Sequence, residues 1–136
     1  MCYFLYGAIN DGINAEDYKI ATKNSMYHFN VGKNNDVNLS VKNNDALYRI
    51  TSKHCDCNSP FGEKKTNKKE LEDLQGLFLN LKSVRGIKHI YISKNWSGEV
   101  NEKEETFHID NIDIMTFLAN AEENCLYKIE LYPKYY

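Results

Sequence analysis

A stripe of six apolar residues at helical spacing constrains the fold of this 136-residue chain more than any other feature. The six residues recur three or four positions apart, as the core-facing side of an amphipathic helix requires: Leu71, Leu74, Leu77, Phe78, Leu81 and Val84. Asn67 is a suitable N-cap, Glu70 follows three residues later as a capping-box partner, and Gly86 supplies a C-terminal stop. The pattern predicts a helix that covers a hydrophobic core.

Much of the remaining chain shows strand patterns. The nearly unbroken apolar run Cys2–Ile9 predicts a strand that is covered on both faces and is therefore central in its sheet. Six further segments predict strands from alternation or from compact apolarity: 26–31, 37–41, 46–52, 87–93, 106–109 and 125–132. Because Pro133 follows the last segment, we expect that strand at or near an edge of the sheet.

Two more helices complete the expected elements. One is expected at 15–24, and another at 112–121 with a cap at Asp110 or Asn111. The chain has neither an internal repeat nor a stretch composed like a linker. We therefore predict one α+β domain over residues 1–136, with a mostly antiparallel sheet and two to three helices packed on one face. A decorated split β-α-β-β-α-β arrangement fits this order.

Composition excludes several classes of function. The net charge of −2, from 17 Lys and Arg against 19 Asp and Glu, lacks the basic footprint of a nucleic-acid-binding protein. No apolar run approaches the roughly 20 residues that span a bilayer, and the first residues lack the basic segment of a secretory signal. The 17 Asn and 15 Lys against 2 Arg are what the codons of an AT-rich genome produce. We expect a bacterial, cytoplasmic protein that binds neither nucleic acid nor membranes.

The densest group of reactive side chains is the tetrapeptide His54-Cys55-Asp56-Cys57. Two thiols and an imidazole are ligands that a borderline-soft metal such as zinc prefers. In an extended segment Cys55 and Cys57 point to the same side, as joint chelation requires. However, the C-x-C spacing is shorter than that of common structural zinc sites, and the chain has no second pair at a familiar distance. The alternative interpretation is therefore a polar loop that holds no metal.

Topology brings a further thiol toward this tetrapeptide. In the split arrangement the first strand lies antiparallel to the strand that ends near Ser52, which places Cys2 beside Cys55. We predict a structural zinc site whose tetrahedral ligands are Cys2, His54, Cys55 and Cys57. Other candidate ligands lie on predicted strands: Cys125, His28, His89 and His108. For these the alternative is a buried apolar thiol or a hydrogen-bonded strand histidine.

Two other kinds of function stay open. A cysteine-dependent enzyme or redox sensor would use Cys55 or Cys57 as a partly exposed thiol of low pKa. A protein-interaction module would use a tyrosine-rich sheet face, since the chain has ten Tyr, or the polar loop around Trp96. Its partner would be another protein or a second copy that pairs along an open strand edge. Among these, a binding or regulatory module is favoured over an enzyme.

Overall fold

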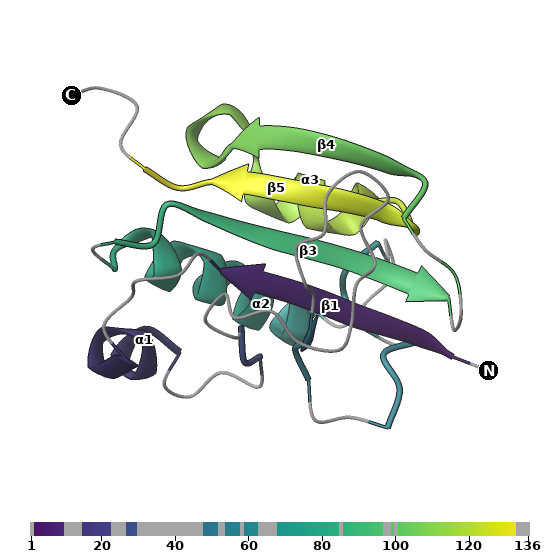
Figure 1. Cartoon of the computed structure of the whole chain (residues 1–136), viewed down its shortest axis with the longest axis horizontal. Coiled ribbons are helices and arrows are strands. Elements are labelled where there is room, and N and C mark those ends of the chain that lie inside the picture. The colour runs from purple at the N-terminus through teal and green to yellow at the C-terminus, as the bar shows by residue number, and fades with distance from the viewer. Residues whose placement is uncertain are drawn as a thin grey trace.

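The computed structural model describes residues 2–9, 15–22, 27–29, 48–51, 54–57, 59–62, 68–84, 86–96, 99 and 101–132. In this part of the chain five strands form one sheet in the order β2-β1-β3-β5-β4 (Figure 1). The strands are β1 (Tyr3–Ile9), β2 (Tyr48–Arg49), β3 (His89–Trp96), β4 (Lys103–His108) and β5 (Cys125–Glu130). The helices are α1 (Ala15–Thr22), α2 (Lys68–Lys82), the 3₁₀ turn η1 (Ile109–Asn111) and α3 (Ile114–Asn120).

The pairing of the strands confirms the predicted α+β class. Three of the four neighbouring pairs are antiparallel, and only β4 and β5 run parallel. Helices α2 and α3 lie behind the sheet in Figure 1, with α1 beside α2. The predicted apolar stripe explains why α2 packs against the sheet. Its residues Leu74, Leu77, Phe78 and Leu81 are all buried in the core under the sheet.

Strand β1 lies between β2 and β3, as its continuous apolarity predicts. Leu5 and Ile9 face the main core, whereas Ala8 is buried on the opposite face against Leu126. Gly7 has no space for a side chain, because a Cβ there would lie 2.7 Å from the Phe29 ring. Strands β2 and β3 lie on either side of β1, as expected for the neighbours of the first strand in the split β-α-β-β-α-β arrangement.

The last strand lies near an edge of the sheet, as predicted, with only β4 beyond it among the described residues. Strand β5 is not the edge strand itself, because β4 pairs with it in parallel from Lys103 opposite Cys125 to His108 opposite Glu130. A parallel pair needs a crossover, and η1 with α3 provides it. Pro133 does not interfere, since β5 ends at Glu130, before the proline that cannot donate to a ladder.

Other boundaries also differ from the predictions. Residues 27–29 are not a strand, although the backbone N–H of His28 donates to the carbonyl of Ile50 at 2.8 Å. The strand expected at 37–41 lies outside the described residues. Helix α3 is capped by Asp113, whose carboxylate accepts the N–H of Met115, because the expected cap residues Asp110 and Asn111 belong to η1.

Strands β3 and β4 are longer than the sequence indicates. Strand β3 continues to Trp96, through polar residues assigned to a loop, and β4 begins at Lys103. The polar part of β3 pairs with β1 as far as Trp96 opposite Tyr3. None of the helices among the described residues combines the length and the apolarity needed to cross a membrane.

Candidate metal centre

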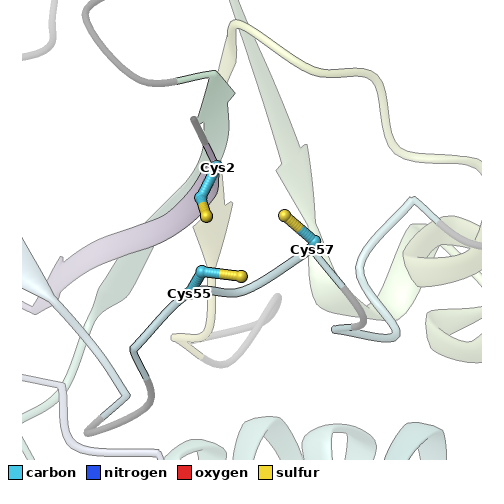
Figure 2. Close-up of side chains that lie close together, drawn as sticks. All are labelled: Cys2, Cys55 and Cys57. Carbon is cyan, nitrogen blue, oxygen red and sulfur yellow. The ribbon is translucent and has the colours of Figure 1, made fainter.

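Three cysteines from two distant segments converge at the start of β1. Residues 55–57 run beside that strand, where the N–H of Asp56 donates to the carbonyl of Tyr3 at 2.9 Å. The N–H of Tyr3 in turn donates to Sγ of Cys57 at 3.3 Å. The three Sγ atoms of Cys2, Cys55 and Cys57 all lie within 4.8 Å of one another. Figure 2 shows them pointing into a common space. We call these three residues the cysteine cluster.

Asp56 holds the cluster in place from the opposite side of its segment. Its carboxylate is 1% exposed and accepts three hydrogen bonds, from the N–H of Leu5 at 2.7 Å, the guanidinium of Arg49 at 3.0 Å and the hydroxyl of Thr51 at 2.5 Å. Alternation along an extended segment turns Asp56 inward and its two neighbouring cysteines to the other side. This role of Asp56 was not predicted, although the sequence carries its signal, an acidic residue between two alternating candidate ligands.

The chain after the cluster is also anchored. The N–H of Ser59 donates to the carbonyl of Asp56 at 3.0 Å, which closes a turn. Two residues later Phe61 is fully buried, with its ring 5.9 Å from that of Tyr127. The N–H of Gly62 then donates to the carbonyl of Leu118 on α3 at 2.6 Å. Backbone hydrogen bonds and the buried Phe61 therefore anchor the segment that carries Cys55 and Cys57.

Hydrogen bonding within the cluster shifts the pKa values of the Cys55 and Cys2 thiols in opposite directions. The backbone N–H of Cys57 and the thiol of Cys2 act as hydrogen-bond donors that lower the pKa of the Cys55 thiol. The same pairing with Cys55, together with burial, raises the pKa of Cys2 to about 11. Between these two thiols, a negative charge is therefore more stable on Cys55 than on Cys2.

The predicted site residues separate into two groups. Cys2, Cys55 and Cys57 come together, whereas His54 is exposed and its ring is not part of the group within 4.8 Å. Trp96 ends β3 half-buried, with its ring edge-to-face on Tyr3 at 4.7 Å. Its role in binding a partner stays a prediction.

The other candidate ligands lie away from the cysteine cluster. The thiol of Cys125 is fully buried and donates to Glu105 at 3.7 Å. His108 makes a hydrogen bond to the carbonyl of Tyr132 at 2.7 Å, as a strand histidine commonly does. His89 packs on the ring of Tyr91 at 5.0 Å. The environments of Cys125 and His108 agree with the structural alternatives considered for them, whereas His28 is exposed and lies outside any strand.

Thiolate chelation is the chemistry that this geometry supports. Tetrahedral zinc with Zn–S bonds of about 2.3 Å places its sulfur atoms about 3.8 Å apart. The cluster, with all separations within 4.8 Å, therefore needs a contraction of about 1 Å or less, which side-chain rotation supplies. No family model, curated protein or solved structure matches the chain, so the site is interpreted from its own geometry.

Proposed function

We propose that this protein is a small binding or regulatory module that holds one zinc ion through Cys2, Cys55 and Cys57. The observation that carries the proposal is the convergence of three Sγ atoms within 4.8 Å from segments 53 residues apart in the sequence. Soft thiolates select zinc and similar ions over magnesium or calcium. The lowered pKa of the Cys55 thiol favours the thiolate form that binds a metal ion.

Three thiolates leave one position of a tetrahedral ion to fill. His54 is next to Cys55 in the chain and is exposed, so rotation of its side chain is unobstructed by the core. The proposal therefore retains His54 as the fourth ligand, with water as the alternative. A His54→Ala variant distinguishes them, because it weakens zinc binding only if the imidazole is a ligand.

The proposed role of the ion is structural. It joins the start of β1 to the segment at 55–57, in addition to the hydrogen bonds at Tyr3 and Asp56. A link that closes a loop of 53 residues restricts the unfolded chain and so favours the folded state. Because the segment is already anchored, the apo protein is expected to fold and to gain stability on binding zinc.

The test is the zinc content of untagged protein purified without a chelator. The account predicts about one zinc per chain in the unaltered protein and none in the Cys55→Ser/Cys57→Ser variant. Cys125→Ala is the matched control, because that cysteine is buried beside Glu105 rather than in the cluster, and it should keep its zinc. The site would be rejected if the Cys55→Ser/Cys57→Ser variant kept its zinc, or if the apo protein did not take up added zinc.

The lowered pKa of Cys55 supports a second candidate function, a peroxide sensor. The Cys55 thiolate would attack hydrogen peroxide, break the O–O bond and become a sulfenic acid with release of hydroxide, which takes up a proton. The thiol of Cys2 or Cys57 would then attack that sulfur, form a disulfide and release water. Peroxide is reduced to two waters while two thiols are oxidised. Intact mass after peroxide treatment tests this, because zinc-free protein should lose two hydrogen atoms and Cys55→Ser should not.

A further inference from the structure

A second concave site lies at the other edge of the sheet from the cysteine cluster. It is a cavity of about 450 Å³ between α3 and strands β4 and β5, whose positions are seen in Figure 1. Phe107 of β4, Phe117 of α3 and Tyr127 of β5 form its apolar wall. The ring of Phe117 lies 5.7 Å from that of Phe107 and 5.0 Å from that of Tyr127. The volume is in the range of small-molecule sites.

The charged residues lining this cavity are all acidic. Glu105, Asp113 and Glu122 contribute carboxylates, and no lysine, arginine or histidine is among the described lining residues. Asp113 is occupied as the cap of α3, and Glu122 pairs with Lys103 at 2.5 Å. Glu105 is different, since within the described part of the chain its carboxylate accepts only the Cys125 thiol at 3.7 Å and forms no ion pair. Glu105 is exposed and lines the cavity.

We infer that this cavity binds a small organic ammonium ion that carries an aromatic or aliphatic body. The apolar body packs on the three rings, whose faces also attract a cation. The ammonium group lies toward Glu105, and the acidic lining disfavours a carboxylate or phosphate ligand. The inference is independent of the zinc site, because no cysteine of the cluster lines the cavity.

Three probes with the same ring distinguish the contribution of charge to binding from the contribution of apolar packing. We would titrate 2-phenylethylamine, 2-phenylethanol and phenylacetate into ¹⁵N-labelled protein and follow the amide resonances of Phe107, Phe117 and Tyr127. The amine is expected to bind most tightly, the alcohol more weakly and the acid least. Equal affinity of the amine and the alcohol, stronger binding of the acid, or no shift at these three amides would overturn the inference.

Two neighbouring carboxylates provide matched variants. Glu105→Gln removes the charge at the cavity and should weaken binding of the amine about threefold to tenfold, with little effect on the alcohol. Glu104→Gln removes the same charge from the next residue of β4, whose side chain points to the other face of the sheet, and should leave binding unchanged. Thermal unfolding checks that both variants fold. An equal loss in both variants, or in neither, would contradict a specific role of Glu105.

Discussion

The carboxylate of Asp56 accepts the backbone N–H of Leu5 at 2.7 Å, so the residue between the two cysteines is joined directly to the central strand. Its other oxygen accepts the Thr51 hydroxyl, and Arg49 supplies the opposite charge. The three hydrogen bonds compensate the cost of burying a carboxylate. They also fix which side of the segment the thiols occupy.

Removal of that carboxylate should destabilise the protein strongly. Asp56→Ala leaves the N–H of Leu5 and the guanidinium of Arg49 without this partner, and we expect a loss of about 3–5 kcal/mol in the free energy of unfolding. Urea unfolding of the apo protein measures it. The control is Asp110→Ala, which breaks an exposed ion pair with Lys82 and should cost about 1 kcal/mol or less. Similar losses in the two variants would contradict the role given to Asp56.

Two glycine substitutions should change stability in opposite directions. Gly7→Ala places a Cβ 2.7 Å from the Phe29 ring and from the carbonyl oxygen of Tyr91, and should cost about 1–3 kcal/mol. Gly76→Ala, in the interior of α2, places a Cβ that meets nothing within 4 Å beyond its own helix backbone and adjacent residues, and should stabilise by about 0.5–1 kcal/mol. Thermal unfolding of both variants gives the signs. A neutral Gly7→Ala would show that β1 does not pack as described.

A buried amide network joins the end of β3 to the residues that precede β4 and β5. The amide nitrogen of Asn95 donates to Asn101 at 2.9 Å and to Asn124 at 3.2 Å, and its oxygen accepts the hydroxyl of Ser93. Asn95→Ala should cost about 1–3 kcal/mol, because it leaves buried acceptors without a donor. Exposed Asn80 on α2 is the control, and its change to alanine should stay within about 0.5 kcal/mol. Equal effects in urea unfolding would contradict the network.

Stability should fall in alkaline solution because of buried tyrosine. Burial raises the pKa of Tyr27 above its usual range, so the folded state keeps the phenol proton while the unfolded state loses it from about pH 10. The unfolded state then binds fewer protons, and the free energy of unfolding decreases as pH rises toward the folded-state pKa. Urea unfolding between pH 8 and 11 should show a shallower decline for Tyr27→Phe. Identical slopes would refute this contribution.

Local patterns predicted the elements that frame the cysteine cluster. The stripe from Leu71 to Val84 predicts α2 because helical periodicity is a local property. The apolar run at Cys2–Ile9 predicts a central strand, and antiparallel pairing then accounts for Cys2 beside Cys55.

Features that depend on distant segments could not be predicted in the same way. The parallel pairing of β4 with β5 follows from a crossover, which leaves no mark in either strand. The inward carboxylate of Asp56 depends on Leu5 and Arg49, 51 and 7 residues away. The cavity at Phe117 exists only because three elements place their rings together.

The most direct test of the zinc proposal is X-ray absorption spectroscopy of the zinc-loaded protein at the zinc edge. The account predicts three sulfur neighbours at about 2.3 Å and one nitrogen or oxygen neighbour at about 2.0–2.1 Å. The Cys55→Ser/Cys57→Ser variant, loaded with the same amount of zinc, should lose the sulfur shell. A first shell of nitrogen and oxygen alone in the unaltered protein would contradict the cysteine cluster as its metal site.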